Sequence, residues 1–140
     1  MRHNKFFTSA IVVCIIALFT MGWVPSPTSA PNKTPITINS SYEFSSYPFP
    51  GTFYTHGALE IQGTVTMEVD FNSNGTRAHC LYTFVAPGGT FTVKEQCVFA
   101  TSPAQGRWEI VSGTGDYANL KGNGSALMPG NEENWEGFIY

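Results

Sequence analysis

Residues 106–127 constrain the fold more than any other part of the sequence. Trp108 and Ile110 alternate with charged residues, which is typical of a β-strand with one buried face. A glycine-hinged loop at 113–115, the aromatic Tyr117 and a second strand with glycines at alternate positions follow. Glycine inside a strand indicates a bulge, a tight bend or the close approach of another backbone. The stretch therefore predicts a strongly coiled sheet of the kind that closes into a small barrel.

A family resemblance rests on the same stretch. Residues 112–122, Ser-Gly-Thr-Gly-Asp-Tyr-Ala-Asn-Leu-Lys-Gly, resemble the Gly-Thr-Gly-x-(Phe/Tyr) signature of the allene oxide cyclase and dirigent barrels. They are more similar still to small secreted barrels of that type without an assigned function. In those, Gly-x-Trp-x-Ile precedes the loop and Trp-x-Gly ends the chain, as residues 106–110 and 135–137 do here. The resemblance implies an eight-stranded antiparallel barrel, but it carries over no catalytic residues, because none of that family's catalytic residues can be placed on this chain.

The rest of the sequence predicts strands and no convincing helix beyond the first 30 residues. Residues 59–71 alternate apolar with polar side chains, which indicates a long strand with one buried face. Weaker patterns predict strands at 36–38, 42–44, 52–56 and 135–140. An acidic turn is predicted at 128–134. We expect one all-β domain at 36–140, an antiparallel, calycin-like barrel of seven to eight strands, with a β-sandwich as the alternative.

The Asn74-Gly75 dipeptide predicts how the strands beside it pair. Asn-Gly is a strong signal for a two-residue hairpin turn, which would pair residues whose numbers add up to 149. Phe71 then lies opposite Ala78 and Val65 opposite Phe84, so apolar residues meet on one face. Because the turn alone sets this register, the agreement supports it.

Gly88-Gly89 predicts the next hairpin in the same way. With these two residues at the centre of the turn, Cys80 lies opposite Cys97 and Tyr82 opposite Glu95 on the core face. A non-hydrogen-bonded antiparallel pair brings side chains close enough for a disulfide. The sequence therefore predicts a Cys80–Cys97 disulfide.

Residues 1–30 predict a secretory signal peptide. Arg2 and Lys5 precede an almost wholly apolar segment, which is shorter than a comfortable membrane span. Residues 28–30 have the small side chains of a cleavage site, but Pro31 is a poor residue to follow one. Cleavage after Gly22 and an uncleaved anchor therefore stay open. Residues 31–35 are predicted to form a flexible leader.

The cysteine count is consistent with export, and removal of the signal peptide changes the net charge of the protein. Cys14 leaves with the signal peptide, and Cys80 and Cys97 remain as a pair suited to an oxidising extracellular or periplasmic compartment. Loss of residues 1–30 removes two basic residues and changes the net charge from −3 to −5. That balance excludes the basic surface by which proteins bind nucleic acid or anionic membranes.

Glu95 is the strongest candidate for a functional side chain, because it is the only charged residue on the predicted inner face of the central strands. A carboxyl group inside a barrel must be hydrogen-bonded, hydrated or protonated. It could orient a ligand or act as an acid or base, or it could be a structural group satisfied by water or by the Tyr82 hydroxyl. The structural interpretation is the one favoured. The residues predicted to line a ligand cavity are Met67, Tyr82, Phe84, Val93 and Glu95.

No other group of residues predicts catalysis, a cofactor or a metal. Asp70 and His79 fall side by side on the outer face, where a surface ion pair is expected, and no third ligand accompanies them. The glycine loop precedes neither a helix nor a Lys-Ser/Thr pair, so it is not a phosphate-binding loop. Three aromatic residues are expected to pack in the core or to plug one end of the barrel: Trp108, Tyr117 and Trp135. Four Asn-x-Ser/Thr sequons occur, at Asn32, Asn39, Asn74 and Asn123.

These observations favour a secreted, non-enzymatic barrel that binds a small apolar ligand or serves as a stable extracellular module. An eight-stranded barrel is wide enough to be filled by its own side chains or to hold one small ligand. The resemblance implies two alternatives, a cyclase- or isomerase-type enzyme in which Glu95 is the acid or base, and a dirigent-like protein that orients radicals made elsewhere. The oligomeric state and the identity of the ligand stay open.

Overall fold

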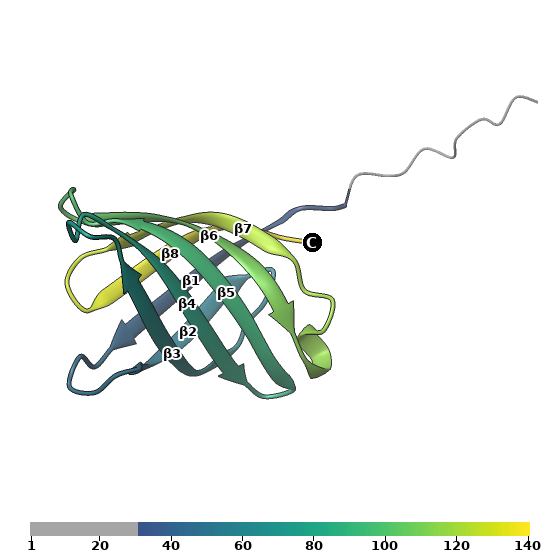
Figure 1. Cartoon of the computed structure of the whole chain (residues 1–140). Helices are drawn as coiled ribbons and strands as arrows, with labels where there is room; N and C mark the ends of the chain where they lie inside the picture. The colour runs from purple at the N-terminus through teal and green to yellow at the C-terminus, as the bar shows by residue number, and fades with distance from the viewer. Residues whose placement is uncertain (1–30) are drawn as a thin grey trace, which may run out of the picture. The chain divides into compact units, whose positions relative to one another are not determined.

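The computed structural model describes residues 31–140, so the predicted signal peptide and Cys14 lie outside the described residues. Residues 31–140 form a closed barrel of eight antiparallel strands, in which each strand pairs with its neighbours in sequence and β8 pairs with β1 (Figure 1). The predicted all-β barrel is thus confirmed. The strands are β1 (Thr34–Tyr42), β2 (Phe49–Gly57), β3 (Gln62–Phe71), β4 (Arg77–Ala86), β5 (Gly89–Val98), β6 (Ala104–Gly113), β7 (Gly122–Met128) and β8 (Glu132–Ile139). Within the part described, no helix is long and apolar enough to cross a membrane.

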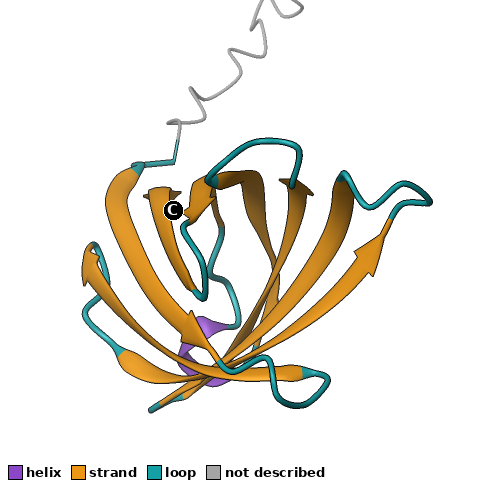
Figure 2. Cartoon of the chain, turned by 90° about the vertical axis from the view of Figure 1, so that its left-hand side faces the viewer, coloured by secondary structure: helices purple, strands orange, loops and turns teal. Residues whose placement is uncertain are grey.

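The barrel has two different ends. One carries the C-terminus, the β2–β3 and β4–β5 turns and the short 3-10 helix η1 (Gly115–Tyr117), and we call it the Tyr117 end (Figure 1). The other carries the β1–β2, β3–β4, β5–β6 and β7–β8 connections, and we call it the Glu95 end. Figure 2 views the barrel from the side of the Glu95 end and shows the strands surrounding one interior.

Tyr117 plugs its end of the barrel, as predicted. Its side chain is buried, its hydroxyl donates a 2.6 Å hydrogen bond to the carbonyl oxygen of Pro87, and its ring centroid lies 5.6 Å from that of Phe91. The loop that carries it is held on the β4–β5 turn, because Asp116 N donates to the Gly88 carbonyl oxygen. The glycine-hinged loop therefore serves to close the barrel.

The β3–β4 register is the one that the Asn74-Gly75 turn predicts. Phe71 faces Ala78, and Val65 faces Phe84. Gly75 takes a positive φ of 67°, a left-handed conformation that glycine adopts without a steric penalty. The turn signal and the apolar pattern therefore fixed this half of the central sheet correctly.

The predicted β4–β5 register is wrong by two residues. Ala86 pairs with Gly89, so Pro87 and Gly88 form the turn, and Gly88 has a φ of 96°. Proline followed by a residue of positive φ is the pattern of a type II turn, which competes with the Gly-Gly turn that was predicted. As a result Cys97 pairs with Ala78, and Cys80 pairs with Glu95 instead of with Cys97.

The interior is filled largely by aromatic side chains. The rings of Phe84 and Phe91 stack with centroids 4.7 Å apart, and the ring of Tyr82 meets that of Trp135 edge-on at the same separation. Trp108 and Trp135 are both buried, as predicted. Contacts of this kind add to the burial of large apolar surface, so the aromatic core stabilises the barrel.

Of the three meanings predicted for the alternate glycines Gly122 and Gly124, a bulge, a tight bend or a close backbone approach, both show the last, because a side chain at either would meet the backbone of β8. Gly124 on β7 faces Gly137 on β8, and a side chain added to Gly124 would collide with the backbone of Glu136. On the inner side, the ring of Trp108 occupies the space that a side chain at Gly137 would need. The β7–β8 wall therefore closes only with glycine at these two positions.

Candidate functional site

Two carboxyl groups lie inside the barrel. Glu95 on β5 is 2% exposed and Glu133 on β8 is 1% exposed, and among residues 31–140 they are the only buried Asp, Glu, Lys, Arg or His side chains. The sequence pattern identified Glu95 but missed Glu133, because the turn predicted at 128–134 covers only residues 129–131. β8 begins at Glu132, so Glu133 starts the inward-facing alternation that continues through Trp135. That period-two pattern was the signal that could have found it.

Tyrosine hydroxyls connect the two carboxyl groups. The Tyr82 hydroxyl donates a 2.7 Å hydrogen bond to Glu95 Oε2 and lies 3.4 Å from Glu133 Oε1. The Tyr42 hydroxyl donates to Glu133 Oε2 at 3.2 Å, and it lies 2.9 Å from the hydroxyl of Ser40. In the part described, every buried side-chain nitrogen and oxygen has a hydrogen-bond partner. Glu95 is thus satisfied by the Tyr82 hydroxyl, as its structural interpretation anticipated.

Burial raises the pKa of both carboxyl groups, so they are weaker acids than an exposed glutamate. Desolvation raises the pKa of Glu133 well above its ordinary value of 4.5, and the nearby Glu95 carboxylate raises it further. Burial also raises the pKa of Glu95, against the lowering effect of the hydrogen bond from Tyr82. Two carboxyl groups this close together in a dry interior do not both ionise readily. The pair therefore retains a proton at pH values where an exposed glutamate has lost its own.

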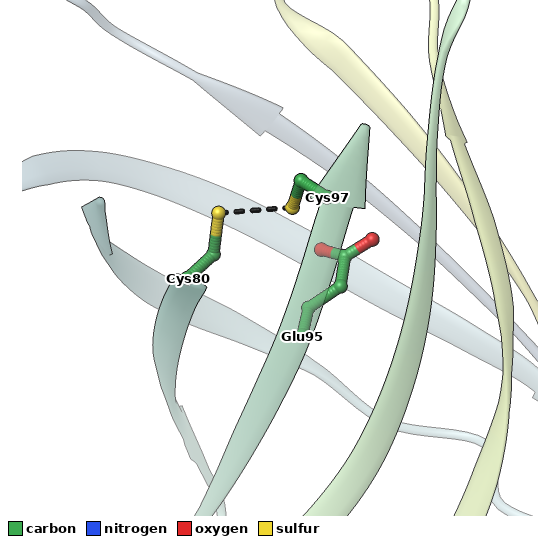
Figure 3. A group of neighbouring side chains, drawn as sticks. All are labelled: Cys80, Glu95 and Cys97. Carbon is green, nitrogen blue, oxygen red and sulfur yellow. Dashed lines mark hydrogen bonds between the residues drawn. The ribbon is translucent and has the colours of Figure 1, made fainter. Parts of the chain in front are cut away.

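Two cysteines lie beside Glu95. The Sγ atoms of Cys80 and Cys97 are 2.9 Å apart, and the two thiols are free and buried (Figure 3). The hydrogen bond with Cys80, followed by burial, raises the pKa of the Cys97 thiol. A carboxylate oxygen of Glu95 and the two sulfur atoms all lie within 4.8 Å of one another. The predicted side-by-side pairing of the cysteines is wrong, but the diagonal pairing still brings their sulfur atoms together.

The Glu95 end combines small inner side chains with exposed rings. Four small residues follow one another across β4, β5, β6 and β7 as direct partners: Ala78, Cys97, Gly106 and Ala126. Around the same end, Phe44 is 51% exposed, Tyr47 is 61% exposed and Phe71 is 53% exposed. These exposed rings offer apolar contact at this end of the barrel, although other large apolar side chains, such as Tyr54 and Phe138, are exposed elsewhere on the surface.

The residues predicted to line a ligand cavity all face the interior: Met67, Tyr82, Phe84, Val93 and Glu95. Each is at most 2% exposed, and all except Glu95 belong to the hydrophobic core. A hollow of about 900 Å³ lies instead on the outer wall, where Lys94, Arg107 and Asn123 line it. The structure thus brings the predicted residues together and fills the space between them with side chains.

The predicted outer-face neighbours Asp70 and His79 are register partners on β3 and β4. Ion pairs within residues 31–140 join other side chains, His56 to Glu60 at 3.1 Å and Lys94 to Glu109 at 3.6 Å. Both pairs are exposed, and exposed pairs contribute little to stability.

A comparison of the chain with protein-family models found no match, and neither did a comparison with curated proteins.

Proposed function

We propose that the protein is a secreted, non-enzymatic barrel that binds one small, mostly apolar molecule carrying a single hydrogen-bonding group. The observation that carries the proposal is that an aromatic core and a pair of carboxyl groups meet inside one closed barrel. Tyr82 belongs at once to the aromatic core and to the network of Glu95 and Glu133. Ligand sites typically combine an apolar lining with a few polar groups that orient the ligand.

The Glu95 end supports entry of the ligand from that side. Tyr117 plugs the opposite end, whereas here the inner residues include Ala78, Gly106 and Ala126. Met67 lies on the same inner face, and a flexible thioether side chain can move aside more readily than a ring. A ligand entering this way would meet the exposed rings of Phe44 and Tyr47 first and then the two carboxyl groups, with the aromatic core behind them.

The carboxyl pair suits the polar group of such a ligand. A carboxyl group that retains its proton donates a hydrogen bond, and its ionised partner accepts one. Glu95 and Glu133 together therefore offer both functions to a hydroxyl, amide or carboxylic acid group. The same feature favours the enzymatic alternative, since a buried carboxyl with a raised pKa can also transfer a proton to or from a bound molecule.

The proposal also includes export and a Cys80–Cys97 disulfide. The signal-like residues 1–30, the even cysteine count after their removal and the short distance between the two sulfur atoms support it. The resemblance to secreted barrels of the allene oxide cyclase and dirigent type supports the same compartment.

Native mass spectrometry of the protein exported by its own host tests the proposal. We expect one small-molecule adduct of constant mass, which disappears in the denatured spectrum. Glu95→Gln should reduce the occupancy of the adduct, while the exposed control Glu68→Gln should leave it unchanged. A bare protein, recovered even from lipid-rich growth, would contradict ligand binding.

Once the adduct is identified, the same variant separates a binder from an enzyme. If the barrel only binds, the ligand leaves chemically unchanged and Glu95→Gln alters affinity alone. If the barrel is an isomerase, the wild-type protein converts the ligand and Glu95→Gln abolishes the conversion.

A further inference from the structure

Cys80, Glu95 and Cys97 converge on one point inside the barrel (Figure 3). Glu95 and Cys97 are two residues apart on β5, so both side chains point to the inner face. Cys80 faces Glu95 across the β4–β5 ladder, which places it diagonally opposite Cys97. Two strands thus supply two sulfur atoms and a carboxylate oxygen, mutually within 4.8 Å.

We propose that the dithiol form of this group is a binding site for one thiophilic divalent cation such as Zn²⁺. Thiolate and carboxylate are ligands that zinc accepts, and a zinc–sulfur bond of about 2.3 Å in tetrahedral geometry places two sulfur atoms roughly 3.8 Å apart. The sulfur atoms of Cys80 and Cys97, now 2.9 Å apart, would separate by roughly 1 Å on binding. Rotation of two short side chains suffices for that movement.

A fourth ligand and an outer hydrogen bond are within reach. Glu133 lies on the other side of the Tyr82 hydroxyl, which contacts both carboxyl groups. Its carboxyl group is not one of the ligand atoms that lie within 4.8 Å of one another, so its role would be to hold a water molecule in the fourth position. The Tyr82 hydroxyl donates to Glu95 Oε2 and would orient that carboxylate towards the metal.

The charge inventory of the interior supports a cation at this point. In the part described, two glutamates are the buried side chains among Asp, Glu, Lys, Arg and His. Two buried thiols lie beside them. Among residues 31–140, no buried basic side chain balances these acidic groups. Buried charges in proteins are paired or coordinate metal ions, so a divalent cation would allow the thiols and Glu95 to ionise together.

Metal binding and the disulfide exclude each other at this site. In the oxidising reaction the two cysteine thiolates lose two electrons to a small-molecule disulfide, which takes up two protons and becomes two thiols. The S–S bond forms as both sulfur–metal bonds break, and the cation is released. The same pair therefore has two forms, a metal-binding dithiol and a metal-free disulfide, selected by the redox state of the compartment.

A titration of the reduced protein tests this site without reference to the proposed ligand. The protein exported by its host is reduced, kept free of oxygen and titrated with Cd²⁺, whose thiolate complexes absorb in the ultraviolet. We expect a charge-transfer band that saturates at one equivalent, with one bound metal ion in the native mass spectrum. Failure to find a small-molecule adduct would leave this result unaffected, so the two proposals fail separately.

Matched variants locate the ligands. Cys80→Ser and Cys97→Ser should each remove at least half of the band, and Glu95→Gln should weaken binding by about tenfold or more, since loss of an outer hydrogen bond alone costs roughly 10- to 100-fold. The exposed Glu68→Gln is the control and should bind as the wild type does. Should a variant fail to fold, the wild-type protein oxidised to the disulfide serves in its place and should give no band. A reduced protein without a stoichiometric band, or an oxidised protein that binds equally well, would overturn the proposal.

Discussion

Glu95 occupies the space that a side chain at Gly106 would need. The two residues lie diagonally across the β5–β6 ladder, and a Cβ atom added to Gly106 would collide with the Glu95 carboxyl group. Gly106→Ala should therefore displace the carboxyl from the Tyr82 hydroxyl and destabilise the protein by about 1–3 kcal/mol, the usual cost of overpacking a core. Chemical denaturation measures the change.

A double-mutant cycle provides the control for this clash. In Glu95→Ala the space beside residue 106 is empty, so adding Gly106→Ala to it should cost much less than in the wild type. Equal costs in the two backgrounds would show that the effect of Gly106→Ala comes from backbone conformation and not from Glu95.

Stability should fall as the pH rises above the ordinary carboxyl pKa of 4.5. The pKa values of Glu95 and Glu133 are raised in the folded protein, so the folded state binds more protons than the unfolded state between the unfolded and folded values. The stabilisation by these protons is fully present below pH 4.5 and is lost as the pH rises through the folded values. Each unit by which a pKa is raised corresponds to about 1.4 kcal/mol. Thermal unfolding of the metal-free protein between pH 4 and pH 9 measures the trend.

Glu133→Gln isolates the group responsible for this pH dependence. The amide keeps the shape of the side chain and cannot ionise, so the variant should lose much of the slope and gain stability relative to the wild type at high pH. A wild-type protein that becomes more stable from pH 5 to pH 8 would contradict the raised pKa values.

Local turn chemistry explains how far the sequence could predict this fold and site. Asn74-Gly75 and the alternation of residues 59–71 agreed on one register, and the structure has it. In Pro87-Gly88-Gly89 two turn types compete within three residues, and choosing the wrong one moved Cys97 and Glu95 by two places. The error exchanged neighbours but not faces, because a shift of two residues preserves the alternation of a strand. The interior position of Glu95 was therefore predictable, whereas its contact with the cysteines was not.

Glu133 was missed for a different reason. It lies within an acidic, proline- and glycine-containing segment whose composition is that of a turn, and only closure of the barrel by β8 against β1 places it inside. That pairing joins residues far apart in the sequence, such as Ser40 and Glu133, which are 93 positions apart. The local alternation could have shown that Glu133 shares a face with Trp135, but it carries no information on a contact of that range, so the meeting of the two carboxyl groups emerged only from the structure.

If the protein is exported, as we propose, it should contain a Cys80–Cys97 disulfide when it is isolated without reductant. Its denatured mass should lie two hydrogens below that of the reduced form, and reduction should lower the free energy of unfolding by about 3 kcal/mol, the value typical of a closed loop of this length. In Cys80→Ser, reduction should change neither the mass nor the stability. An unreduced protein with the mass of the free dithiol would contradict the disulfide.

Tyr117 should stabilise the barrel mainly through its ring and only secondarily through its hydroxyl. Tyr117→Phe removes the 2.6 Å hydrogen bond to the Pro87 carbonyl oxygen and should cost about 1 kcal/mol. Tyr117→Ala also removes the ring that packs on Phe91 and should cost about 3–5 kcal/mol, the range for emptying an aromatic core position. Urea denaturation measures both free-energy changes. The Thr114 amide donates to the Thr90 carbonyl oxygen, so hydrogen exchange at this amide reports whether the loop opens. If Tyr117→Ala costs no more than Tyr117→Phe, the ring does not close the end of the barrel, and the Phe91 side of the core tolerates solvent.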